Sequence, residues 1–273
     1  FRNNDRPGIM LGSAVRSYVN RFGAAPAPRI AVFTNSDEGH KTAQDLLAKG
    51  VRVAAVIDVR DDAPRADAYD VFAGSKVTDS KGRLGLRRIE VERADGTRQW
   101  IDCGALAVSG GWNPNVHLTC HQRGRPHWDD TLAAFVPGGV LPPGLGVAGA
   151  ANGDMSTAGA LRSGAAAACK ALSLKSMPEL PEAEDAPLSI TPFWHVAGKG
   201  RAWLDQQNDV TVKDVKLSHQ EGYRSVEHLK RYTTLGMATD QGKLSNINGL
   251  AILSQSLGAD IPAVGTTTFR PPY

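Results

Sequence analysis

Apolar and polar positions in the first quarter of the chain follow a strand, helix and strand pattern. An apolar run covers 29–33, positions at helical spacing follow over 37–49, and a second apolar run over 51–57 ends at Asp58. This order predicts the β-α-β unit of a dinucleotide-binding fold, in which an acid about 20 residues on meets a ribose hydroxyl. Upstream, 8–23 has helical spacing, and Gly23 predicts the end of that helix.

The pattern changes to strands after residue 71. Strand-like segments cover 71–79, 84–94 and 98–109, and Asp95-Gly96 predicts a tight hairpin between the last two. The region 116–143 has no regular pattern. Farther on, 144–168 predicts a short strand, a glycine-rich turn and a helix of small residues. The prolines and acids of 176–192 indicate a linker, and helices are expected around 225–236 and 247–258.

The glycine-rich segment 144–168 is the strongest candidate for a ligand site. Its small residues allow a backbone to approach a ligand closely, and Ser156 and Thr157 are suited to cap the helix that follows. The free N–H groups of a helix start attract an anion such as a pyrophosphate. The candidate residues on this evidence are Gly149, Ala150, Gly153, Ser156 and Thr157. The alternative is a strand-to-helix turn whose small residues serve packing alone.

The turn after the first apolar run departs from the G-x-G-x-x-G pattern. It reads Thr34-Asn35-Ser36-Asp37-Glu38-Gly39, which lacks two of the three glycines. Asp37 and Glu38 would repel a pyrophosphate. We therefore expect Asp37 to cap the helix and both acids to complement its dipole, so that this unit keeps the fold and not the ligand.

Two other stretches are weaker candidates. Ser109–Asn115, "SGGWNPN", predicts a hinge, because its glycines permit unusual backbone angles, and lining a nucleotide pocket is the alternative. His117, His121 and His127 fall in the irregular region without a recognised ligand spacing, so a solvated loop is expected and no metal site is predicted.

Composition narrows the class of protein. The 273 residues are 41% hydrophobic and 22% charged, which suits one or two globular domains. The net charge of +3 comes without a Lys/Arg run, so no nucleic-acid partner is expected. No apolar run approaches the roughly 20 residues that span a bilayer, so no membrane is expected. Three widely spaced cysteines indicate a reducing cytoplasm.

The fold class expected is α/β, a two-dinucleotide-binding-domain, Rossmann-type flavoprotein fold. It is N-terminally incomplete, because no opening strand carries the glycine fingerprint, and a small mostly helical domain follows. The expected divisions are 1–28 (end of the first dinucleotide domain and linker), 29–112 (second dinucleotide domain), 113–175 (completion of the first), 176–192 (linker), 193–260 (helical domain) and 261–273 (linker to a further domain).

Five stretches carry a family resemblance that runs over essentially the whole chain. They read "FRNNDRPGIML", "GGWNPNVHL", "VAGAANGDMSTAGALRSGAAAA", "EGYRSVEHLKRYTTLGMATDQGKLSN" and "PAVGTTTFRPPY". Together they closely resemble the α subunits of heterotetrameric sarcosine oxidases. The resemblance implies an enzyme that oxidises sarcosine to glycine and hydrogen peroxide, and that forms methylenetetrahydrofolate when tetrahydrofolate is present.

The resemblance also implies cofactors and partners. FAD would lie in the β subunit, FMN near the α–β interface, and tetrahydrofolate in a domain beyond this chain, with γ and δ subunits completing the complex. The α subunit would bind NAD that carries no electrons in turnover. Ala150 stands where flavin-binding relatives have an acid, which favours NAD over FAD. The resemblance places this NAD on Ala150, Met155 and Thr157 with their small neighbours.

The last third resembles a small helical domain that carries a [2Fe–2S] cluster in some relatives. The cluster cysteines are replaced here by Asp205, Gln207, Asp240 and Ser245. Thiolates hold such clusters, so no cluster is predicted and an iron–sulfur electron-transfer module is disfavoured. Lys243, Arg231 and Thr239 are expected near the flavin. The remaining alternative is a non-catalytic scaffold with vestigial nucleotide sites.

Overall fold

The computed structural model describes residues 1–186, 188–266 and 270. Its α/β part is built on a parallel sheet in the order β1-β8-β2-β3-β4. These strands are β1 (Ile9–Leu11), β2 (Arg29–Thr34), β3 (Arg52–Asp58), β4 (Val71–Phe72) and β8 (Ala105–Ser109). With helix α2 (Asp37–Ala48), β2 and β3 confirm the predicted β-α-β unit.

The segment before β2 contains a strand that the sequence did not predict. Helix α1 (Gly12–Phe22) begins later than expected because Ile9–Leu11 pairs in parallel with β8 as β1. The predicted stop is confirmed, since Gly23 adopts a left-handed conformation with φ 63°. Ile9–Leu11 thus adds one strand to the parallel sheet, and α1 follows it directly.

Both faces of the parallel sheet are covered, as its continuous apolar strands require. On one face α1 and α2 bury Val15, Val19 and Leu46 against the sheet. On the other lies an antiparallel sheet of β5 (Lys76–Lys81), β6 (Arg88–Glu92) and β7 (Arg98–Asp102). The predicted Asp95-Gly96 hairpin is confirmed between β6 and β7. The expected continuous strand 98–109 divides into β7 and β8, which belong to different sheets.

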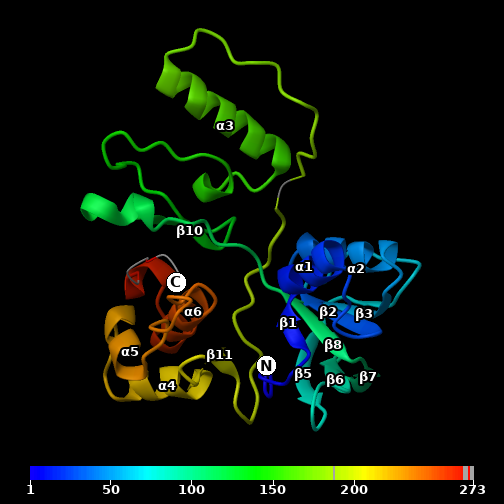
Figure 1. Cartoon of the computed structure of the whole chain (residues 1–273). Coiled ribbons are helices and arrows are strands. Elements are labelled where there is room, and N and C mark those ends of the chain that lie inside the picture. Colours follow the sequence, from blue (N-terminus) through cyan, green and yellow to red (C-terminus); the bar gives the residue numbers. More distant parts are fainter. Residues whose placement is uncertain (187, 267–269, 271–273) are drawn as a thin grey trace.

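The middle of the chain leaves this unit and forms a separate layer (Figure 1). It contains η1 (Leu118–Arg123), the hairpin of β9 (His127–Asp129) and β10 (Ala134–Val136), η2 (Gly149–Asn152) and α3 (Thr157–Leu172). The strand expected before the glycine-rich turn is absent from 144–148, where the described backbone has no neighbouring strand to pair with. Cys169 is the buried residue of α3.

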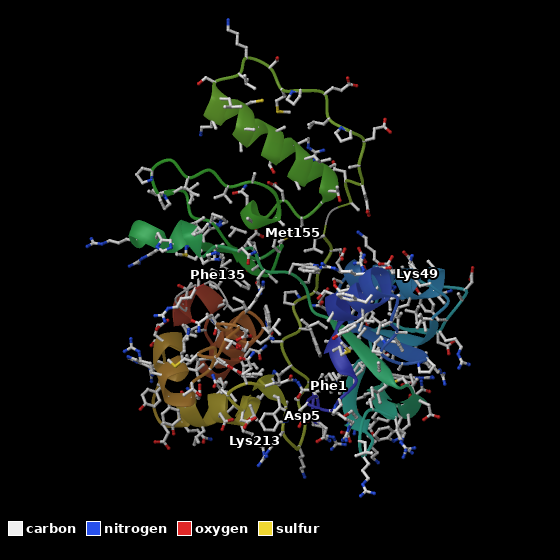
Figure 2. All side chains as sticks on the ribbon, in the orientation of Figure 1. Phe1, Asp5, Lys49, Phe135, Met155 and Lys213 are labelled. Carbon is white, nitrogen blue, oxygen red and sulfur yellow. The ribbon has the colours of Figure 1, made fainter. Side chains whose placement is uncertain are left out.

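The last third folds around its own apolar core. Its elements are β11 (Trp203–Asp205), β12 (Val210–Thr211), α4 (Val212–Gln220), α5 (Val226–Thr233), α6 (Asn246–Leu257) and η3 (Ile261–Val264). The helices expected around 225–236 and 247–258 are thereby confirmed. Phe135 of β10 joins Leu229, Leu250 and Leu253 in this core, which ties the middle segment to the helices (Figure 2). Of the expected linker 261–273, residues 267–269 and 271–273 lie outside the described residues.

No helix within the described ranges is long and apolar enough to cross a membrane.

Candidate functional site

The glycine-rich candidate forms a compact turn between η2 and α3. Gly149 and Gly153 have φ values of 64° and 94°, a left-handed conformation that costs glycine little. The Gly149 N–H donates to Ser163 Oγ at 2.9 Å, and the Asp154 N–H donates to the Gly149 carbonyl at 3.1 Å. Ala150 is exposed and Met155 is half-buried. The structure thus brings the predicted residues 149–157 together on one turn.

The start of α3 is capped as the sequence predicts, by one of the two expected residues. Ser156 Oγ accepts a hydrogen bond from the Gly159 N–H at 3.0 Å, whereas Thr157 is the first residue of the helix. The side-chain cap is therefore Ser156, and the expectation that both residues cap is corrected for Thr157. The backbone of Ser156 is extended, which aims its hydroxyl back at the helix start.

An acid from the 176–192 linker stands in front of this helix start. Ser156 Oγ donates to Asp185 Oδ1 at 2.8 Å, and Arg162 Nη2 lies 3.0 Å from the same carboxylate. These two contacts, the Ser156 hydrogen bond first, lower the pKa of Asp185. The Ala158 N–H donates to the Glu184 carbonyl at 3.0 Å. A hydroxyl and a guanidinium converge here on a carboxylate beside a helix start, and such a donor set suits a pyrophosphate.

The second nucleotide candidate, at the end of β3, is taken up by internal contacts. Asp58 is fully buried, and its Oδ2 lies 2.8 Å from His40 Nε2 and 2.8 Å from Arg60 Nη2. Arg60 Nη1 also pairs with Asp37 at 2.8 Å. Asp37 is the first residue of α2, not its cap. Its carboxylate binds Arg60, so the expectation that Asp37 caps the helix is wrong.

The charges of this cluster hold one another in the ionised form. Burial alone raises the pKa of Asp58, but hydrogen bonds from His40 and Arg60 outweigh it and leave the pKa below its ordinary value. Burial likewise lowers the pKa of Arg60, and the bonds to Asp58 and Asp37 reverse that effect and raise it. With these partners, the Asp58 carboxylate has no exposed face for a ribose hydroxyl. The geometry therefore favours the expectation that this unit keeps the fold and not the ligand.

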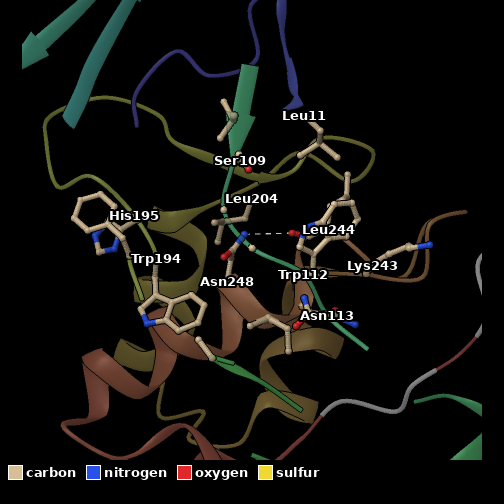
Figure 3. Close-up of a pocket in the computed structure, with 18 of the residues that line it drawn as sticks. Leu11, Ser109, Trp112, Asn113, Trp194, His195, Leu204, Lys243, Leu244 and Asn248 are labelled. Atoms are coloured by element: carbon tan, nitrogen blue, oxygen red, sulfur yellow. Dashed lines mark hydrogen bonds between the residues drawn. The ribbon is translucent and has the colours of Figure 1, made fainter. Parts of the chain in front are cut away.

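A cavity of about 580 Å³ lies between the α/β unit and the helical domain. In Figure 3, Trp194 and His195 stand on one side of it, and Trp112, Lys243 and Leu244 on the other. Asn113 and Asn248 add amide groups to this wall, in which aromatic rings also lie. The residues suit a planar, partly aromatic group with a negative charge, because rings stack and Lys243 supplies a cation.

Sequence reasoning found part of this cavity. The Ser109–Asn115 stretch lines it, so the pocket-lining alternative for "SGGWNPN" agrees with the structure. Lys243 also lines it, whereas Thr239 is held away by Gln207 Oε1, which accepts from the Thr239 N–H and hydroxyl. Trp194 and His195 were missed because they follow a linker composition. The available signal was the cluster Phe193-Trp194-His195 directly after Pro192.

Of the four positions where the resemblance implies cluster cysteines in relatives, Asp205, Gln207 and Asp240 hold loops together through side-chain hydrogen bonds, whereas the buried Ser245 Oγ has no partner among the described residues. Asp205 is buried, and its carboxyl group accepts from the N–H groups of Gln207, Asn208 and Gly236 at 2.9, 3.0 and 2.8 Å. Within the described residues, no group of three or more His, Cys, Asp or Glu side chains is placed to hold a metal ion.

Comparisons with known proteins find the same family that the sequence motifs resemble. Residues 199–273 match the family model of the sarcosine oxidase A3 domain. The whole chain is 43% identical to the sarcosine oxidase subunit alpha of Rhizobium meliloti and 40% identical to that of Corynebacterium sp. (strain U-96). It covers 28% and 31% of those two proteins.

A solved structure supports the fold. The crystal structure of L-proline dehydrogenase from P. horikoshii superposes over 100% of this chain and 53% of its own, with a TM-score of 0.67 at 19% identity. Because that identity is low, the likeness concerns the fold alone, an α/β architecture with a helical portion. Together with the identities over the whole chain, these findings show that the chain is similar along its entire length to the α subunits of sarcosine oxidases, of which it spans 28–31%.

Proposed function

We propose that this chain is part of the α subunit of a sarcosine oxidase. The full protein would oxidise sarcosine to glycine and hydrogen peroxide, and would form methylenetetrahydrofolate when tetrahydrofolate is present. The observation that carries this proposal is the 38–43% identity over 100% of the chain to proteins named sarcosine oxidase subunit alpha. The complex would act in the cytoplasm, with β, γ and δ subunits as partners.

Within that complex, residues 149–157 would bind the pyrophosphate of a non-redox NAD. Support comes from the left-handed glycines of the turn, and from the Ser156 hydroxyl and the Arg162 guanidinium, which both contact the Asp185 carboxylate. Asp185 would have to leave this position for a pyrophosphate to take it. The exposed Ala150 leaves the outer side of the turn open.

The cavity between the two domains would face the FMN at the interface with the partner subunit. Its aromatic wall and Lys243 support this assignment, because a flavin presents a planar ring and a phosphate. FMN would supply electron transfer to oxygen, and FAD in the β subunit would supply amine oxidation. Tetrahydrofolate would bind beyond this chain, and 113–175 would complete the first dinucleotide domain.

A scaffold is the second candidate function. The internal contacts of Asp58 and the position of Asp185 both favour nucleotide sites that have lost their ligands. In that case the chain would only join the flavin-bearing and folate-binding parts of an amine-oxidising complex.

The activity is tested on the complex that contains the full-length subunit. Purified complex is mixed with sarcosine in air, and hydrogen peroxide is measured, with glycine as the control. We expect sarcosine-dependent peroxide. Peroxide formed from another N-methyl amine and not from sarcosine would contradict the substrate that we propose.

A further inference from the structure

The carboxyl ends of β2 and β8 form the crevice where open parallel sheets bind their ligands. In this chain an extended segment of the later linker, residues 189–193, lies across that crevice. We call this segment the strap. The Thr191 N–H donates to the Asn35 carbonyl at 3.0 Å, and Asn35 Nδ2 donates to the Thr191 carbonyl at 2.8 Å. Ser36 and Ile190 pair as an antiparallel bridge next to these bonds.

Side chains fix the strap at both ends. Ile190 packs so closely on Gly111 that a Cβ at Gly111 would overlap the Ile190 Cδ1 atom. Phe193 meets Phe33 of β2 edge to face, with ring centroids 6.5 Å apart. Arg60 Nη1 lies 3.5 Å from Ser189 Oγ, which links the strap to the buried Asp58 cluster. Backbone pairing, apolar packing and a polar bond therefore act on the same short segment.

The strap also forms part of the wall of the interdomain cavity. Ile190, Pro192 and Phe193 line the cavity, and Trp194 and His195 follow them directly. Asn35, which binds the strap, lines the same cavity. One segment thus covers the crevice and shapes the cavity beside it.

We propose that the crevice at the end of β2 is a binding site for an extended peptide, and that the strap is its resident ligand. The strap is held by one main-chain hydrogen bond, by the Asn35 amide and by an isolated antiparallel bridge, with Gly111 as the recess for the Ile190 side chain. A nucleotide is excluded because the strap holds the backbone of Asn35 and Ser36, the place where a phosphate would meet the turn. This proposal does not depend on NAD at residues 149–157.

The strap is tested by hydrogen exchange with mass spectrometry on the complex containing the full-length subunit. The variant Asn35→Ala removes the side-chain bond to Thr191, and Asn20→Ala, on the exposed face of α1, is the matched control. We expect exchange in peptides covering 189–194 to rise about tenfold in Asn35→Ala and to stay unchanged in Asn20→Ala. Unchanged exchange in Asn35→Ala would overturn the assignment of Asn35 as the anchor.

A second arm needs no variant. NADH or ADP at millimolar concentration is added to the wild-type complex, and exchange is followed over 29–40 and 189–194. We expect no change in either segment, even where the nucleotide protects 149–157. Protection of 34–40 together with faster exchange of 189–194 would show that a nucleotide displaces the strap, and it would overturn the proposal.

Discussion

Asp58, at the end of β3, forms a hydrogen bond with His40, with 2.8 Å between Asp58 Oδ2 and His40 Nε2. Asp58 holds the sequence position of the acid that meets a ribose in dinucleotide-binding units. Here its carboxylate faces inward, onto His40 and Arg60. The acid is present at the expected place in the sequence, but it binds side chains of the protein itself and not a ribose.

Removing this buried charge is expected to destabilise the α/β unit. Asp58→Asn leaves the Arg60 guanidinium with a weaker acceptor in a buried place, so we expect a loss of about 3 kcal/mol in the free energy of unfolding. Asp62→Asn, at an exposed position, is the control and should change it little. Thermal unfolding of both variants measures the difference. Equal stability would mean that the cluster contributes nothing net.

The same carboxylate predicts a pH dependence. The pKa of Asp58 in the folded chain lies below its ordinary value of 3.8, so the unfolded state binds the proton more tightly. Its stabilising contribution is therefore present above about pH 4 and is lost as the pH falls through the folded pKa. We expect the stability gap between wild type and Asp58→Asn to be constant from neutral pH to about pH 5 and to shrink below pH 4. A gap that widens on acidification would contradict this sign.

Cys103 should resist thiol reagents in the folded protein. Burial raises its pKa to about 12, and it is almost completely inaccessible. At about pH 8 we expect iodoacetamide to leave Cys103 unmodified and to label it only after unfolding, because the thiolate is the reactive form. Peptide mass spectrometry identifies the site. The half-buried Cys120 is the internal comparison and should react faster.

Asp205 should matter for the stability of the helical domain, because its buried carboxyl group joins three backbone N–H groups. Asp205→Ala removes the acceptor of three backbone N–H groups, so we expect a loss of about 2–3 kcal/mol in stability. Asp205→Asn keeps one acceptor oxygen and should lose less. Chemical denaturation followed by the fluorescence of the nearby Trp203 compares the two. Equal losses in both variants would show that the charge, and not the acceptor geometry, is what matters.

Ala150 tests the nucleotide turn without disturbing a core, since its side chain is exposed. Ala150→Leu adds bulk where the dinucleotide backbone would approach, so we expect the NAD content of the purified complex to fall several-fold. Ala24→Leu, at an exposed position in the linker before β2, should retain the wild-type content. Nucleotides are extracted and quantified by chromatography. Equal NAD in both variants would place the nucleotide elsewhere.

Local patterns predicted the elements whose cause is local. The β2-α2-β3 unit follows from apolar spacing, the β6–β7 hairpin from Asp95-Gly96, and the α3 cap from Ser156 before a helical run. The strand β1 escaped prediction because three residues carry too little pattern, and it exists only through pairing with β8. Long-range pairing of this kind leaves no periodic signal.

The candidate sites show the same division. The small residues of 149–157 are visible in sequence because they are contiguous, as is the loss of glycines in the Thr34–Glu38 turn. The contacts of Asp185 with Ser156, and of the strap with Asn35, join segments far apart in the chain. The linker composition of 176–192 gave no indication that its acids and Ile190 would lie against two distant turns.

We propose that the chain belongs to a sarcosine oxidase and binds NAD. The most direct test of this proposal is the cofactor content of the native complex. The complex is denatured, its released nucleotides are identified by mass spectrometry, and iron is measured in the same sample. We predict about one NAD per α chain, together with FMN and FAD, and no iron. A complex without NAD would contradict the role of residues 149–157, and iron near two per chain would contradict the reading of the helical domain.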